Sequence, residues 1–237
     1  GGQPALFGVN AFATLAEALA AVDTGGTVIV NAGIYAESVT LTNNVILEIT
    51  GPDTAGTVTI DSLTADAGST IVIEGTSTLE IGDASDTTVA ATISGTGNLV
   101  KQGAGDVTLT GDNDYSGTTT INGTGLLIAG SDLALGATTG QTFVNNGGGL
   151  RLADGVTVTG ETVTLRGPGG GGSPAQFSGA LQVGAGESAT WAGDVILGAN
   201  SPRIGTLDGG TLTITGDVGE DAPGRQLDIS ADLGTGT

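Results

Sequence analysis

Alternation of apolar and polar residues is the dominant pattern along this chain. From residue 27 onward, runs of about four to six residues place Val, Ile or Leu at every second position, and Gly, Asn, Asp or Thr separates them. A period of two is typical of β-strands with one buried face, and the separating residues are typical of turns. The sequence therefore predicts many short strands, namely TVIV, SVTLT, NVILEIT, TVTID, TIVIE, TLEI, DVTLT, TTTI, GLLIAG, LRLA, VTVTG, TVTLRG, ALQVG, DVILG, TLTIT and QLDIS.

The one helical pattern that we identify lies at residues 12–26, FATLAEALAAVDTGG. Thr14 with Glu17 three residues later forms a capping box, which satisfies free amide donors at a helix start. Gly25 provides a stop at the other end. The side chains that share one helical stripe are Phe12, Leu15, Leu19 and Val22.

Short, evenly spaced strands are compatible with a sandwich, a barrel or a solenoid. The solenoid is favoured because aromatic residues make up only 3% of the chain and 45 residues are Gly, which suits thin coils. Few dipeptides have the sequence of a tight hairpin turn. Asn122-Gly123 is the best candidate, but the runs on either side of it are equally compatible with strands that continue around a coil. Glycine, apolar alternation and glycine again recur in GGGLRLADGVTVTGETVTLRG, GGTLTITGDV and GAGDVTLTG, at a period of roughly 20 to 25 residues.

Residues 95–130, GTGNLVKQGAGDVTLTGDNDYSGTTTINGTGLLIAG, resemble the autotransporter-associated β-strand repeat. The matching positions are Gly95, Gly97, Leu99, Lys101, Gly103, Gly105, Leu109, Gly111, Asn113, Tyr115, Gly117, Thr119 and Ile121. The N-terminal stretch ATLAEALAAVDTGGTVIVNAGIYAESVTL resembles the capping start of pectin-lyase-like β-helices. Both resemblances imply a right-handed parallel β-helix, and the repeat implies an exported protein displayed on a bacterial cell surface.

We accordingly expect a single all-β domain over residues 1–237, with an N-terminal cap at 1–26 that includes a short capping α-helix and the autotransporter-associated repeat at 95–130. Residues 228–237, DISADLGTGT, resemble the TISGTGN that precedes this repeat. We therefore expect further coils to continue beyond the C-terminal end.

Charge and composition narrow the classes of function. The chain has 25 acidic and 5 basic residues and no His or Cys. A net charge of −20 disfavours nucleic acid and anionic membrane surfaces as partners. Because the chain has neither His nor Cys, it lacks the ligands of most zinc, iron and copper sites. No apolar run is long enough for a transmembrane helix. We expect no membrane insertion and no resident cofactor.

The polar residues Lys101, Asn113 and Tyr115 lie on the same alternation parity as the apolar residues of the repeat. A functional interpretation is a small polar site. The interpretation we favour is structural: inside a coil, these groups pair with backbone groups of neighbouring coils, because buried polar groups need partners. The resemblance assigns Gly103, Gly105 and Gly117 to the same structural motif.

Two further kinds of chemistry stay open. Asp112, Asp114 and Ser116 have the spacing of the first half of a calcium loop, but Gly123 stands where its bidentate Glu is expected, so we treat them as weak candidates. A polysaccharide-active lyase or hydrolase would use paired carboxylates. The acidic residues available for it are Glu48, Asp61, Glu74, Glu80, Asp83 and Asp86.

We predict no catalytic residues, because the chain has no His and almost no bases to support those acids. The predicted function is an extracellular or cell-surface structural or adhesive element. The partners we expect are copies of the chain, further β-helix coils, a surface receptor or a polysaccharide. Polysaccharide chemistry and calcium-dependent binding are the alternatives. For Trp191, the sole tryptophan, we favour packing over sugar stacking.

Overall fold

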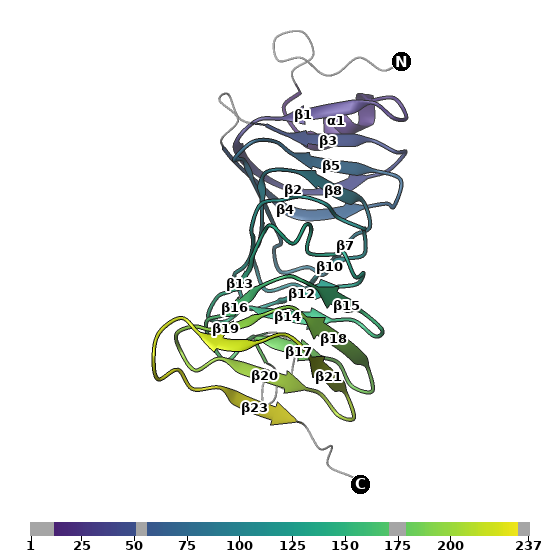
Figure 1. Cartoon of the computed structure of the whole chain (residues 1–237). Helices are drawn as coiled ribbons and strands as arrows, with labels where there is room; N and C mark the ends of the chain where they lie inside the picture. The colour runs from purple at the N-terminus through teal and green to yellow at the C-terminus, as the bar shows by residue number, and fades with distance from the viewer. Residues whose placement is uncertain (1–11, 51–55, 171–178, 232–237) are drawn as a thin grey trace.

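The alternating runs form parallel strands stacked in a β-solenoid of about 8 turns, in a computed structural model that describes residues 12–50, 56–170 and 179–231 (Figure 1). Every run predicted from the sequence overlaps a strand. The helix is α1 (Leu15–Ala21). The strands are β1 (Thr27–Val30), β2 (Gly33–Leu41), β3 (Ile46–Ile49), β4 (Thr57–Ala65), β5 (Thr70–Ile73), β6 (Thr78–Ile81), β7 (Thr87–Val89), β8 (Thr92–Gly95), β9 (Asn98–Lys101), β10 (Val107–Leu109), β11 (Thr119–Ile121), β12 (Leu126–Ala129), β13 (Thr142–Val144), β14 (Gly149–Leu152), β15 (Thr157–Thr159), β16 (Val163–Leu165), β17 (Leu181–Val183), β18 (Ser188–Ala192), β19 (Val195–Leu197), β20 (Arg203–Thr206), β21 (Thr211–Ile214), β22 (Val218–Glu220) and β23 (Asp228–Ala231).

The strands line three faces of the solenoid, and each strand pairs in parallel with its counterparts in the neighbouring coils. Face one runs from the first halves of β2 and β4 through β6, β9, β11, β13, β16 and β19 to β22. Face two runs from the second halves of β2 and β4 through β7, β10, β12, β14, β17 and β20 to β23. Face three consists of β1, β3, β5 and β8, and later of β15, β18 and β21.

The core is a set of columns in which inward side chains of successive coils stack on one another. On face one, the column below Ile60 contains Ile81, Lys101, Ile121, Val144, Leu165 and Leu197. Buried and more exposed residues alternate along most strands, and the inward residues of β9 and β11 are fully buried. Apolar columns of this kind supply the main driving force for folding, at about 25 cal/mol per Å² of buried apolar surface.

Helix α1 covers the N-terminal end of the core. Thr14 caps its start, since the Thr14 hydroxyl accepts a hydrogen bond from the Glu17 amide at 3.1 Å, but the Glu17 carboxylate accepts from the Ala13 amide and not from Thr14. The helix ends at Ala21 with Val22 as its C-cap, earlier than the predicted stop at Gly25. The carboxylate of Glu37, on β2, accepts hydrogen bonds from the amides of Leu15 and Ala16, at 2.9 and 3.1 Å. These contacts hold the helix over the first coil. Among the described residues, no helix has the length and hydropathy needed to cross a bilayer.

Glycines occupy corners where the preceding coil leaves no room for a side chain. A Cβ at Gly117 would lie 2.1 Å from the Gly97 carbonyl oxygen, and one at Gly123 would lie 2.1 Å from that of Gly103. Gly123 also has a φ of +79°, which favours glycine. The flanking strands β11 and β12 pair with neighbouring coils rather than with each other, so Asn122-Gly123 turns a coil and forms no hairpin.

Candidate functional site

Face three is interrupted in the middle of the solenoid, and the residues of the predicted structural motif lie at this interruption. Between β8 and β15, this face contains no strand within the described residues. Asn113, only 2% exposed, occupies the gap. Its side-chain oxygen accepts a hydrogen bond from the Ile93 amide at 2.8 Å, and its side-chain nitrogen donates to the Ala134 carbonyl at 2.7 Å. One amide group thus bridges three successive coils, alongside backbone bonds such as those from the Asp114 amide to the Ile93 carbonyl at 3.0 Å and from the Asn113 amide to the Leu133 carbonyl at 3.1 Å.

Lys101 points into the core at the end of β9, stacked between Ile81 and Ile121. Its Nζ donates a hydrogen bond to the Gly103 carbonyl at 3.1 Å. Burial lowers the pKa of the Lys101 ammonium to about 8, although the carboxylates of Asp106 and Asp86 act in the opposite direction.

Space for this ammonium comes from a glycine of the next coil. A Cβ at Gly125 would lie 2.6 Å from the Lys101 Nζ and 2.2 Å from the Gly105 carbonyl oxygen. The glycines of the repeat therefore make room for its lysine as well as for the coil corners.

Tyr115 is fully buried and takes part in a line of polar side chains that crosses coils. Its hydroxyl lies 2.5 Å from the Thr119 hydroxyl, and Thr119 is paired in register with Thr142. The Thr142 hydroxyl donates to Oε1 of Glu161 at 3.0 Å. Burial and the charge of Glu161 both raise the pKa of the Tyr115 phenol above its ordinary value.

Glu161 is the least satisfied polar group of this line. It is 3% exposed, and Oε2 is buried without a hydrogen-bond partner. Burial raises the pKa of the Glu161 carboxyl to about 7, while the hydrogen bond from Thr142 acts in the opposite direction. Glu161 was not among the residues predicted from the sequence. In the sequence it is an acidic residue between two alternating runs, VTVTG and TVTLRG, a pattern that does not distinguish a buried carboxyl from a solvated one.

Several acidic corner residues also connect the coils, a role that sequence reasoning missed. Each one accepts, at Oδ1, a hydrogen bond from a backbone amide of the following coil. Such charge-assisted bonds stabilise the stack, so these carboxylates are more than a solvated acidic face. The donor–acceptor pairs are Asp106 N to Asp86, Leu126 N to Asp106, Thr157 N to Asp132, Ser188 N to Asp154 and Asp217 N to Asp194, at 2.7 to 3.1 Å. Asn98 does the same for the Thr118 amide at 2.9 Å.

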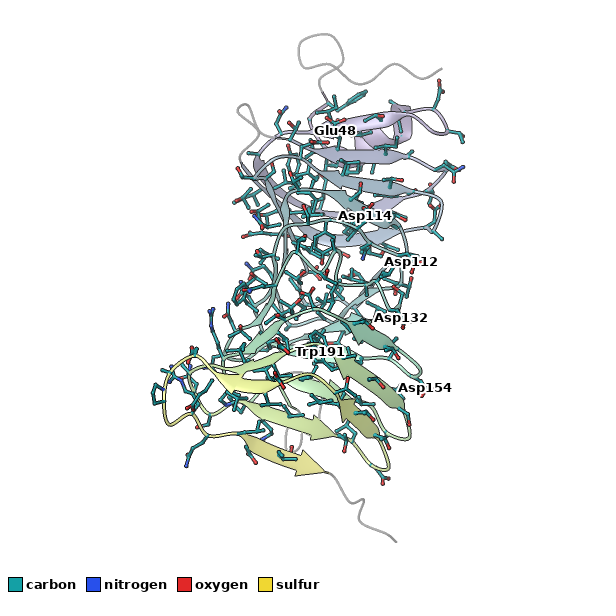
Figure 2. The ribbon with its side chains drawn as sticks, viewed as in Figure 1. Glu48, Asp112, Asp114, Asp132, Asp154 and Trp191 are labelled. Carbon is teal, nitrogen blue, oxygen red and sulfur yellow. The ribbon has the colours of Figure 1, made fainter. Side chains whose placement is uncertain are left out.

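The weak calcium candidates lie outside the core. Asp112 and Asp114 are exposed, and Ser116 is partly exposed. Figure 2 shows Asp112, Asp132 and Asp154 one below another along one edge of the solenoid. Within the described residues, no group of three or more acidic side chains has the arrangement of a metal site.

The carboxylates considered for polysaccharide chemistry lie around the outside of the first coils. Glu80 accepts a hydrogen bond from the Thr59 hydroxyl at 3.0 Å, and Asp83 accepts one from the Ser85 amide. Asp86 is one of the corner acceptors described above. Glu48 projects from β3 (Figure 2), and Glu74 is exposed. Asp61 is partly exposed in β4.

Trp191 of β18 is fully buried (Figure 2). It is paired in register with Val158 and Ile214 of the adjacent coils. Its indole nitrogen donates to the Asp194 carbonyl at 3.3 Å. The side chain fills the core, as the packing interpretation predicts, and offers no surface for sugar stacking.

Comparisons with known proteins agree with the location of the motif. The sequence model of the passenger-associated-transport-repeat matches residues 99–126, inside the stretch identified by resemblance. The adhesin BmaC autotransporter of Brucella suis biovar 1 (strain 1330) is 34% identical over 199 residues, or 75% of this chain. The aligned part is 6% of the length of that adhesin. No solved structure matches the chain.

Proposed function

Because the chain is an autotransporter passenger repeat protein, exported to the bacterial cell surface, we propose that it forms a stiff adhesive segment of a surface adhesin. The observation that carries the proposal is the unbroken coil-to-coil bonding. Parallel strands stack on face two from β2 to β23, and buried side chains bridge the interruption on face three. Such a stack transmits force along its axis through backbone hydrogen bonds.

The outer faces supply the contact surface in this proposal. Threonines form an outward column on face two, in which Thr40 pairs with Thr64 and Thr88 pairs with Thr108. Thr40, Thr64 and Thr88 are exposed, whereas the inward neighbours of this column are buried. Hydroxyl groups held in a regular row suit hydrogen bonding to a polar receptor or polysaccharide. The similarity to a protein named as an adhesin supports this role.

An attachment assay tests the proposal. Beads coated with the chain are allowed to settle on host-cell and polysaccharide layers and are then washed under flow. We expect coated beads to remain in excess over bare beads. Beads with Gly155→Ala should behave as wild type, whereas beads with Gly123→Ala, whose coil corner has no room for a methyl group, should detach. Equal retention of coated and bare beads on every layer would refute the adhesive role.

Self-association into fibres is a finer prediction of the same proposal. Helix α1 covers the N-terminal end of the core, which disfavours head-to-tail contacts between copies. Sedimentation equilibrium tests it: a fibre-forming chain shows mass rising with concentration, and a monomer at all concentrations contradicts fibre formation.

A further inference from the structure

The outer surface of face one carries no acidic side chain over four successive coils, although the chain has a net charge of −20. The second and fourth residues of segments 98–102, 118–122, 141–145 and 162–166 are buried, so the first, third and fifth point outward. Parallel pairing of β9, β11, β13 and β16 aligns these outward residues in three columns. The segments read NLVKQ, TTTIN, QTFVN and TVTLR, so Arg166 is the one charged residue among them. We call this surface the carboxylate-free patch.

Acidic residues return in the coils on either side of the patch. Glu80 pairs in register with Val100, and its carboxylate accepts a hydrogen bond from the Thr59 hydroxyl. Asp194 lies just before β19, and its carboxylate accepts the Asp217 amide at 3.1 Å. An anion bound on the patch is therefore not placed directly against a carboxylate of these columns, which would repel it.

Arg166 is the one arginine of the described residues that forms no ion pair there. Arg151, Arg203 and Arg225 each contact a carboxylate, at 2.9, 2.8 and 2.7 Å. The remaining basic residue, Lys101, is buried in the core. The partly exposed Arg166 is thus the cation that an anionic ligand can reach without breaking an ion pair.

Neighbouring residues hold the Arg166 guanidinium in place. Its Cζ lies 4.8 Å from the centroid of the Phe143 ring, within the range of a cation–π interaction. Nη1 donates to Oδ1 of Asn145 at 3.4 Å, and Nδ2 of Asn145 donates to Oδ1 of Asn122 at 2.8 Å. A Cβ at Gly198, which follows Arg166 in its column, would lie 2.8 Å from the Arg166 Cγ, so this glycine makes room for the arginine. Most of the five guanidinium N–H donors are not bonded to described residues.

A sugar that carries a carboxylate fits this arrangement. A planar guanidinium binds a planar carboxylate through two parallel N–H···O bonds, and one cation balances one negative charge. Apart from Val100 and Phe143, the other outward side chains of the patch are amides and hydroxyls, which can donate to and accept from sugar hydroxyls. Two apolar side chains are too few to anchor a peptide, and one cation is too few to neutralise a nucleic acid.

We propose that the carboxylate-free patch binds a carboxylate-bearing polysaccharide. Arg166 pairs with a sugar carboxylate, and the amide and hydroxyl side chains of the patch bind the sugar hydroxyls. The polymer runs along the columns, because equivalent side chains recur from coil to coil at a spacing of about 4.8 Å. This site lies on face one, separate from the threonine column on face two, so it goes beyond the adhesive surface proposed above.

Isothermal titration calorimetry of the full chain with polygalacturonate tests the proposal. EDTA is present throughout, so that calcium cannot bridge the acidic chain and the acidic polymer. We expect polygalacturonate to bind at least about tenfold more tightly than its fully methyl-esterified form, whose sugars are uncharged. Arg166→Gln should remove this preference. Arg166→Lys, which keeps the charge without the planar fork, should retain only part of it.

Matched controls separate the site from general charge and from folding. Arg225→Gln removes an arginine that is already paired with a carboxylate and should leave binding unchanged. Thr120→Glu, which adds an acid to the patch, should weaken binding, whereas Thr88→Glu, the same change on face two, should not. Melting temperatures of all variants should stay close to that of wild type.

Equal affinity for polygalacturonate and its methyl ester, or an undiminished preference in Arg166→Gln, would overturn the proposal. Equally tight binding of a polyglutamate peptide would also overturn it, because any acidic chain would then suffice. Coated beads that attach to host cells although the polymer does not bind would refute this site and leave the adhesive role intact. Arg166-dependent polymer binding by a chain whose beads never attach would refute the adhesive role alone.

Discussion

Glu161 should make the stability of the solenoid depend on pH in a window where few other groups titrate. The chain contains no His. Burial raises the pKa of the Glu161 carboxyl from the ordinary value of 4.5 to about 7, so the folded state binds a proton more tightly than the unfolded chain. The stabilisation is complete below pH 4.5 and is lost as pH rises through 7. Replacement by Gln removes the ionisable group and keeps an acceptor for the Thr142 hydroxyl.

The magnitude follows from the difference between the two pKa values. At about 1.4 kcal/mol per pKa unit, the free energy of unfolding should fall by about 2 to 3 kcal/mol between pH 5 and pH 8. For a chain of this size, about 2 to 4 °C of melting temperature accompany each kcal/mol, so the expected decrease is about 5 to 10 °C. Because Glu161 is 3% exposed, little of this effect is lost to solvent screening.

The assay is thermal and urea unfolding, followed by circular dichroism, of wild type, Glu161→Gln and Glu74→Gln across pH 5 to 8. Glu74 is an exposed carboxylate and serves as the matched control. Glu161→Gln should flatten the decrease and Glu74→Gln should retain it. A decrease of equal size in all three proteins would show that the buried carboxyl is not its source.

Three further substitutions and one metal test follow from the same geometry. Gly123→Ala should cost at least about 2 kcal/mol more than Gly155→Ala in urea unfolding. The two glycines have φ values of +79° and +78°, but only Gly123 has a carbonyl in the Cβ position, so equal losses would contradict the corner argument. Lys101→Met should abolish the rise in stability that wild type shows from pH 8 to 10.5, because the lowered pKa of the buried amine makes the folded state bind protons less tightly there. A rise that persists in Lys101→Met would refute this assignment. Calcium should leave the melting temperature unchanged, and a calcium-induced increase that disappears in Asp112→Asn would establish the site that we consider weak.

Much of the fold could be predicted because alternation reports directly on a buried face. From Leu99 to Ile121, every buried side chain, including those of Lys101 and Val107, has an odd residue number, as the alternation predicts. Strands β7, β8, β9, β13, β18, β20 and β22 were not among the predicted runs. They are three to five residues long and contain at most two Val, Ile or Leu residues each, so their strand conformation depends on pairing with adjacent coils.

The polar framework was only partly predictable. Parity placed Lys101, Asn113 and Tyr115 inside, but it could not identify their partners, which are Gly103, two backbone groups some twenty residues away, and Thr119. Glu161 and the corner carboxylates gave no distinct signal, because an acidic residue at a turn has the same sequence pattern whether it is solvated or bonded to the next coil. Contacts across coils require the register, which alternation alone does not fix.

The most direct test of the central claim, that the inward polar residues of the repeat hold the coils together, is the unfolding free energy of Asn113→Ala. This change leaves the Ile93 amide and the Ala134 carbonyl buried without their partner, at about 1 to 3 kcal/mol each. The predicted loss is therefore about 2 to 6 kcal/mol, with the outward control Asp114→Ala within about 0.5 kcal/mol of wild type. Wild-type stability for Asn113→Ala, together with lost attachment of coated beads, would show instead that Asn113 belongs to a binding site.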